Sequence, residues 1–154
     1  MLAGEQTLQQ IVLNPLAWYE EHGITLHRGF KVSRIDRVKR RVLADDGCGG
    51  AVEAPYDRLL LATGSNPFIL PVPGRDLPGV IGYRDIADTE AMIDAAAKYR
   101  HAVVIGGGLL GLEAANGLAR RGMAVTVVHL MPWLMERQLD ETAGKLLQAE
   151  LEKR

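Results

Sequence analysis

A run of six residues in the second half of the chain could bind a phosphate: Gly106-Gly107-Gly108-Leu109-Leu110-Gly111. Gly106 permits a tight turn, Gly108 has no Cβ and lets the backbone approach a pyrophosphate, and Gly111 lets a following helix pack closely. The helix dipole and the backbone N–H groups of the first turn, which includes Leu109 and Leu110, favour a bound anion. The spacing therefore predicts the pyrophosphate site of a dinucleotide.

The residues around this pattern strengthen the prediction, because a glycine pattern alone is often a plain turn. An apolar run at residues 102–105 comes directly before the glycines, and residues 109–121 continue with apolar positions at helical spacing. Gly122 is placed to end that helix, and residues 124–128 form a second apolar strand. Strand, helix and strand at this length predict a parallel pair with a right-handed crossover, as in a Rossmann-type fold.

The residue that closes the second strand departs from the usual pattern. In a nicotinamide dinucleotide site an Asp or Glu accepts hydrogen bonds there from the adenosine ribose, whereas this sequence has His129. A neutral imidazole has one acceptor nitrogen and does not repel a 2′-phosphate, and Arg137 follows a short way downstream. We expect both residues near the ribose, with the choice between NADH and NADPH open. A strand-end histidine without a ligand role is the alternative.

Composition and charge narrow the class of protein. The 154 residues are 47% hydrophobic and carry a formal charge of −1, which argues against nucleic acid or an anionic membrane as the main partner. The longest apolar stretch, residues 102–112, contains glycines and is too short to span a bilayer. No signal-peptide pattern is visible and Cys48 is the single cysteine, so we expect a cytoplasmic protein without disulfides. The histidines lack metal-ligand spacing, so no metal site is predicted.

The predicted elements differ between the two halves of the chain. In the first half Asn14 and Pro15 predict the start of a helix that Gly23 ends, followed by strands at residues 25–28, 31–36, 41–44, 51–53 and 58–62. A turn at residues 45–50 predicts a hairpin. Residues 66–82, rich in proline and glycine, predict an extended connector. In the second half Asp85 and Asp140 are placed to start helices at residues 86–99 and 141–152.

A second motif precedes the connector. The segment from Tyr56 to Pro67 ends a strand in Ala-Thr-Gly, about forty residues before the glycine pattern. It resembles a strand found late in the FAD-binding domain of pyridine nucleotide-disulfide oxidoreductase-type enzymes. The two motifs together are more specific than either alone. The resemblance implies an α/β fold, an incomplete FAD/NAD(P)-binding Rossmann-type module with a small antiparallel β segment in its first half.

This resemblance also implies a division of the chain and roles for its residues. Residues 1–75 would be the C-terminal part of the FAD-binding domain, residues 76–100 a connector and crossover helix, and residues 101–154 the N-terminal part of the NAD(P)-binding domain. Thr63 and Gly64 would lie near the FAD. The glycines of the second motif would hold the NAD(P) pyrophosphate, and Glu113 would lie towards the nicotinamide end.

Four further segments narrow the resemblance, at residues 18–24, 83–89, 104–115 and 134–140. They are similar to the large subunit of assimilatory NAD(P)H-dependent nitrite reductases. In such enzymes a hydride passes from NAD(P)H to FAD. Electrons then pass through iron–sulfur centres to a sirohaem, where nitrite is reduced to ammonia. The resemblance therefore implies an oxidoreductase with NAD(P)H and FAD as cofactors.

Several parts of such an enzyme are not in this sequence. It has no earlier glycine motif for FAD, no later FAD-contacting segment and no cysteines for the iron–sulfur and sirohaem sites. We therefore interpret the chain as an internal fragment that is inactive by itself and self-associates. Two alternatives stay open. One is a flavoprotein reductase of another acceptor, such as nitrate reductase, ferredoxin or rubredoxin, and the other is a non-catalytic nucleotide-binding module.

Overall fold

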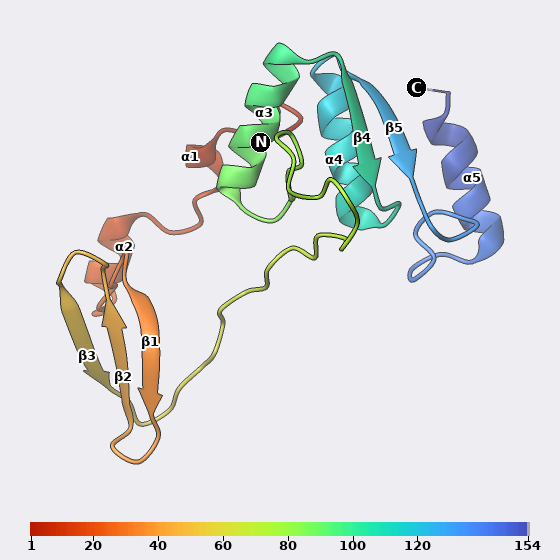
Figure 1. Cartoon of the computed structure of the whole chain (residues 1–154). Helices are drawn as coiled ribbons and strands as arrows, with labels where there is room; N and C mark the ends of the chain where they lie inside the picture. Colours follow the sequence, from red (N-terminus) through yellow and green to blue (C-terminus); the bar gives the residue numbers. More distant parts are fainter. Residues whose placement is uncertain (154) are drawn as a thin grey trace. The chain divides into compact units, whose positions relative to one another are not determined.

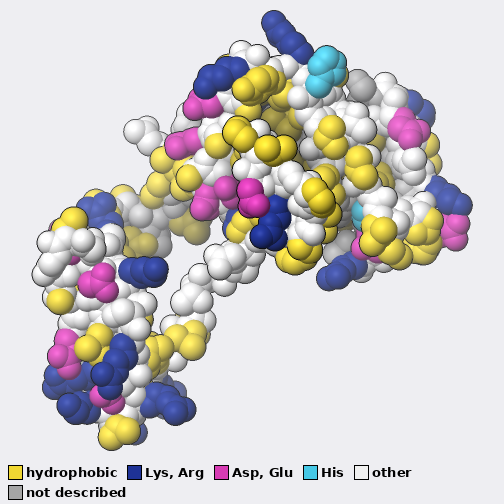
Figure 2. Space-filling view, viewed as in Figure 1, with side chains coloured by type: hydrophobic (Ala, Val, Ile, Leu, Met, Phe, Trp, Pro, Cys, Tyr) yellow, Lys and Arg dark blue, Asp and Glu magenta, His cyan; other side chains and the backbone are white. Residues whose placement is uncertain are grey.

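The structure, a computed structural model, describes residues 1–153 and consists of two compact units (Figure 1, and Figure 2 in a space-filling view). One unit joins Met1–Ile11 to the chain from Asn66 onward, and the other spans Val12–Ser65. We call the first the glycine-turn unit and the second the meander unit. The two units are defined by how compactly their residues pack, and they do not test the functional boundaries predicted at residues 75 and 100. These boundaries stay predictions.

The glycine-turn unit contains the predicted strand–helix–strand. Its elements are α1 (Leu8–Ile11), α3 (Ile86–Lys98), β4 (His101–Ile105), α4 (Leu109–Arg120), β5 (Ala124–Val128) and α5 (Glu141–Leu151). β4 and β5 pair in parallel, and α4 packs against both of them (Figure 1). The prediction of an α/β fold with a parallel pair is confirmed. The short helix α1 was not expected, because its four residues show no helical pattern.

Alternation along the two strands decides which face of the pair is covered. Ala102, Val104 and Val125 are partly buried and pack against the core beside α4. Their neighbours on the opposite face, Val103 and Ile105, are exposed. Successive side chains of a strand point to opposite faces, so the pair has one packed face and one apolar face that the described residues leave open.

The N-terminal segment completes the core of this unit. Leu2 is only 3% exposed and joins a cluster with Met92, Ala114, Leu118 and Met123. It fits there because α4 has Gly117, where a Cβ would stand 2.6 Å from Leu2 Cγ. Arg121 also donates hydrogen bonds to the carbonyls of Met1 and Leu2. This contact could not be predicted from the sequence, because it joins residues far apart in the chain.

Two helices of this unit begin at aspartates, as predicted. Asp85 caps α3 by accepting from the Asp88 N–H at 2.8 Å, and the Asp88 carboxylate accepts in turn from the Asp85 N–H. Asp140 caps α5 by accepting from the Ala143 N–H at 2.8 Å. These bonds satisfy donors that the first helical turn otherwise leaves free.

The meander unit is a short helix followed by three antiparallel strands. Its elements are α2 (Leu16–Glu21), β1 (Lys31–Asp36), β2 (Arg41–Asp45) and β3 (Ala51–Pro55), with the strand order β1-β2-β3. The predicted hairpin at residues 45–50 is confirmed by the pairing of β2 with β3. The predicted cap of α2 is wrong by one residue, because Pro15 rather than Asn14 is the capping position. Helix ends are commonly uncertain by this amount.

Two predicted strands do not form. Residues 25–28 and 58–62 have neither helix nor strand conformation, and Leu60 is 86% exposed. A strand requires a neighbour to receive its hydrogen bonds, and no described segment pairs with either run. The apolar run within residues 58–62 was therefore insufficient to form a strand without a partner. The predicted connector is confirmed in that residues 66–82 contain no helix or strand.

Candidate functional site

The glycine turn directly extends strand β4. The Gly106 N–H donates to the Val128 carbonyl at 2.8 Å, which continues the ladder one residue beyond the strand. The backbone then turns sharply, with φ of +121° at Gly106. L-residues with a side chain rarely adopt this conformation, so the position requires glycine. The tight turn that the pattern predicted at Gly106 is therefore present.

The third glycine lets α4 close tightly onto this turn. A Cβ at Gly111 would lie 1.9 Å from the Gly106 carbonyl oxygen, which is backbone and cannot rotate away. The prediction attributed Gly111 to packing of the helix on the sheet. In the structure its first constraint is the turn itself, because the helix passes directly over the carbonyl of Gly106.

The space in front of Gly108 is open. A Cβ built there meets no atom within 4 Å, and Gly108 caps α4 without any side-chain hydrogen bond. This differs from α3 and α5, whose aspartates bond to the first turn. The N-terminus of α4 therefore keeps its dipole and backbone donors directed at a space that a branched side chain would fill, and such a cradle fits the pyrophosphate of a dinucleotide.

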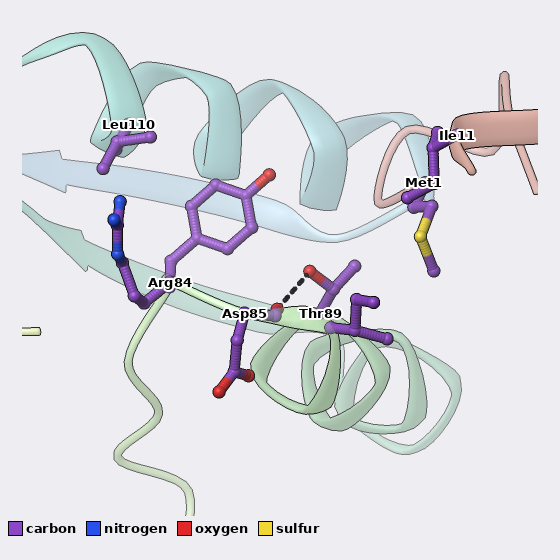
Figure 3. A pocket seen from close by; sticks show the side chains of 8 residues that line it. Met1, Ile11, Arg84, Asp85, Thr89 and Leu110 are labelled. Carbon is purple, nitrogen blue, oxygen red and sulfur yellow. Dashed lines mark hydrogen bonds between the residues drawn. The ribbon is translucent and has the colours of Figure 1, made fainter. Parts of the chain in front are cut away.

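Other predicted residues lie on the first turns of α4. Leu109 and Leu110 are exposed, and Glu113 is exposed one turn further on. Leu110 borders a pocket of about 300 Å³, whose other walls come from the start of α3 and the N-terminal segment (Figure 3). Burial, and next to it the negative charge of Glu113, raise the pKa of Tyr83, which also lines this pocket.

His129 has both ring nitrogens in hydrogen bonds. Its Nδ1 accepts from the Gly107 N–H at 3.0 Å, and its Nε2 lies 3.1 Å from Glu136 Oε2. A backbone N–H can only donate, so Nδ1 carries a lone pair and Nε2 carries the proton that Glu136 accepts. The imidazole therefore has no acceptor left for a ribose hydroxyl, and the carboxylate beside it is that of Glu136.

The loop after β5 is attached to the glycine turn. The Met135 N–H donates to the Gly107 carbonyl at 3.0 Å, with φ of +58° at Met135. A Cβ at Gly107 would stand 2.5 Å from Leu134 Cδ2 and 2.8 Å from the His129 ring. Gly107 is thus constrained by this loop, although the motif leaves its position free. Sequence reasoning missed both Gly107 and Glu136. The signal for Gly107 was a glycine between the two glycines that the motif requires.

The remaining predicted residues are less constrained. Arg137 is exposed in the same loop, next to Glu136. Thr63 and Gly64 belong to the meander unit, where they are exposed in an irregular segment. Cys48 is exposed, and the residues described contain no group of three side chains suited to a metal ion. Within the same residues no helix has the length and apolarity needed to cross a membrane.

Residues 3–154 match the family model of the pyridine nucleotide-disulphide oxidoreductases. The chain belongs to this family, as the sequence resemblance implied. Among solved structures, a ferredoxin reductase from Rhodopseudomonas palustris is similar with a TM-score of 0.86 at 28% identity, covering 97% of this chain and 36% of that one. A NAD-dependent persulfide reductase from A. fulgidus is similar with a TM-score of 0.88 at 27% identity, covering 99% and 29%.

Curated relatives are more similar in sequence. A nitrite reductase [NAD(P)H] of Bacillus subtilis is 53% identical over 99% of this chain and 18% of its own length. An assimilatory nitrate reductase electron transfer subunit of the same species is 47% identical over 100% of this chain and 20% of its own length. The chain therefore spans about a fifth of the length of these relatives.

Proposed function

We propose that this chain carries the NAD(P)H pyrophosphate site of a cytoplasmic flavoprotein oxidoreductase that passes electrons through FAD towards nitrite. The observation that carries the proposal is the geometry of the glycine turn. The N-terminus of α4, which follows this turn, has no side-chain cap and faces open space at Gly108. The similarity to nitrite reductases supports the choice of nitrite as acceptor.

Within this proposal the residues have separate tasks. The N–H groups of the first turn of α4 hold the pyrophosphate, and Gly106 and Gly111 keep that turn closed. Glu113 lies towards the nicotinamide end, while Thr63 and Gly64 flank the flavin. The hydride-accepting chemistry would be supplied by FAD, because no side chain performs it. The iron–sulfur centres and sirohaem would be held outside the residues of this chain, which has one cysteine.

The test is Gly108→Val in the full-length flavoprotein that contains this chain. The branched side chain fills the space that the phosphates need, so binding of NAD⁺ and NADP⁺ should be lost while FAD content stays near that of the wild type. Asn116→Val, on the exposed side of the same helix, is the matched control and should bind normally. Unchanged affinity of Gly108→Val for both nucleotides would contradict the assignment of the pyrophosphate site.

A second acceptor has direct support. The nitrate reductase electron transfer subunit matches the whole of this chain at 47% identity. The same NAD(P)H site could therefore serve a flavoprotein that delivers electrons to nitrate reduction. Reduction of nitrite to ammonia by the purified full-length enzyme with NADH or NADPH favours the first function. Flavin reduction without nitrite turnover favours the second.

We also propose that the isolated chain self-associates through the open face of the β4–β5 pair. Val103, Ile105 and Val128 are exposed there and form an apolar surface. Unpaired strand edges and such surfaces recruit other chains. Sedimentation velocity should show oligomers at micromolar concentration, and Val103→Lys should reduce them. Val38→Lys, an exposed valine of the meander unit, should not. A monomer across this range would contradict the proposal.

A further inference from the structure

The strand β5 ends without the carboxylate that a nicotinamide dinucleotide site usually has. The residue there is His129, whose side chain is 15% exposed and whose nitrogens both have hydrogen-bond partners. It cannot accept from a ribose hydroxyl without giving up the Gly107 N–H. A carboxylate that binds the ribose can therefore come only from another position of the chain.

Glu136 is such a carboxylate, brought back to the glycine turn by the loop. Its Oε2 accepts from His129 Nε2, while its Oε1 has no hydrogen bond with any described residue. The neighbouring Met135 is bonded through its N–H to the Gly107 carbonyl. The two bonds hold the carboxylate beside the turn although it is seven residues beyond His129.

The side chain is also suitable in exposure and charge. It is 24% exposed, so it is partly shielded by the loop and still reachable by a ligand. A carboxylate has two acceptor oxygens and about four lone-pair sites, enough for a histidine and for ribose hydroxyls at once. Its negative charge opposes the 2′-phosphate that distinguishes NADPH from NADH.

We propose that Glu136, held in place by His129, is the residue that receives the adenosine ribose and selects NADH over NADPH. The inference rests on the proposed NAD(P)H site. Glu136 is the binding residue, and His129 is a positioning residue that acts through it. Gly107 contributes by donating its N–H to His129, which fixes the protonated nitrogen of the imidazole towards Glu136.

The first test measures equilibrium dissociation constants of NAD⁺ and NADP⁺ in the full-length flavoprotein by calorimetry, so that no turnover is needed. Glu136→Gln keeps the size of the side chain and removes its charge. It should weaken NAD⁺ binding about tenfold, which corresponds to the loss of one charged hydrogen bond. It should weaken NADP⁺ binding less, or strengthen it. Glu141→Gln removes the same charge five residues on, at an exposed ion pair with Lys145, and should change neither constant.

The second test asks whether His129 acts through Glu136. His129→Asn retains an acceptor near Nδ1 for the Gly107 N–H but is too short to reach Glu136. This variant should weaken NAD⁺ binding. His129→Gln, whose amide nitrogen reaches the Nε2 position, should restore part of the affinity for NAD⁺. The double variant His129→Asn with Glu136→Gln should bind NAD⁺ no more weakly than Glu136→Gln alone. Additive losses would contradict the positioning role.

The outcomes separate this inference from the function on which it rests. If Gly108→Val abolishes binding while Glu136→Gln leaves the ratio of the NAD⁺ and NADP⁺ constants within a factor of about two, less than one ordinary hydrogen bond, the inference is wrong and the function stands. If the wild type binds neither nucleotide, or Gly108→Val binds both normally, the proposed site is wrong and the inference fails with it.

Discussion

The two units each contain a sequence motif for a nucleotide, yet only one motif has its expected structure. In the glycine-turn unit β4, the turn, α4 and β5 are contiguous in the chain and pair with one another. In the meander unit the Ala-Thr-Gly segment should end a strand, and residues 58–62 form none. A phosphate site made by one strand–helix–strand needs only its own neighbours, whereas the flavin segment depends on strands that no described residue provides.

The largest expected difference between the units is therefore in cofactor retention. The isolated 154-residue chain should keep no flavin after incubation with excess FAD and desalting, because the strand before Thr63 and Gly64 is not formed. It should also fail to oxidise NADH or NADPH with an artificial acceptor. The measurement is visible absorption of the desalted protein. A stoichiometric flavin spectrum would show that the Ala-Thr-Gly segment does not need a partner strand.

The same contrast explains what could be predicted from sequence. The elements around the glycine turn follow from short-range patterns: the apolar run of β4, glycines at fixed spacing and a capping aspartate such as Asp140. The link from His129 to Glu136 could not be predicted, since it depends on an irregular loop that folds back on Gly107. The burial of Leu2 was missed for a similar reason, because its partner Gly117 is remote in sequence and glycine in a helix has several explanations.

The second prediction compares two glycines three residues apart. Gly111→Ala should destabilise the glycine-turn unit by about 2–3 kcal/mol, within the range for steric conflict in a packed site, because its Cβ meets the Gly106 carbonyl. Gly108→Ala meets no atom and should cost well under that amount. Each unit has one tryptophan, Trp18 and Trp133. Urea unfolding followed by Trp133 fluorescence in a Trp18→Phe background therefore reports the stability of the glycine-turn unit.

A failure of this comparison would be informative. Equal stability of the two alanine variants would mean that α4 can move away from Gly106 at little cost. The close approach of the helix to the turn would then not be required for the fold.

The third prediction concerns the helix starts within the glycine-turn unit. Asp140→Ala should reduce the stability of α5, and Asp85→Ala that of α3, each by about 1 kcal/mol. Both aspartates accept from backbone N–H groups of the first turn, whereas α4 has no such bond to lose. Glu90→Ala, at an exposed position inside α3, is the control. Losses for Glu90→Ala as large as those for the caps would contradict the capping explanation.

The smallest expected effect lies in the hairpin of the meander unit and appears only in acid. The N–H groups of Cys48 and Gly50 donate to Asp46 and lower the pKa of its carboxyl. The folded hairpin therefore favours the ionised form of Asp46. The stability that this carboxylate adds to the hairpin is complete above the usual aspartate pKa of about 3.9, and it is lost as the pH falls through the lowered pKa of the folded state. The amide shifts of Cys48 and Gly50 should therefore titrate together below that pH.

Asp46→Asn retains an acceptor oxygen and should abolish the transition, while Asp45→Asn should leave it in place. A transition that persists in Asp46→Asn would mean that another group controls the turn.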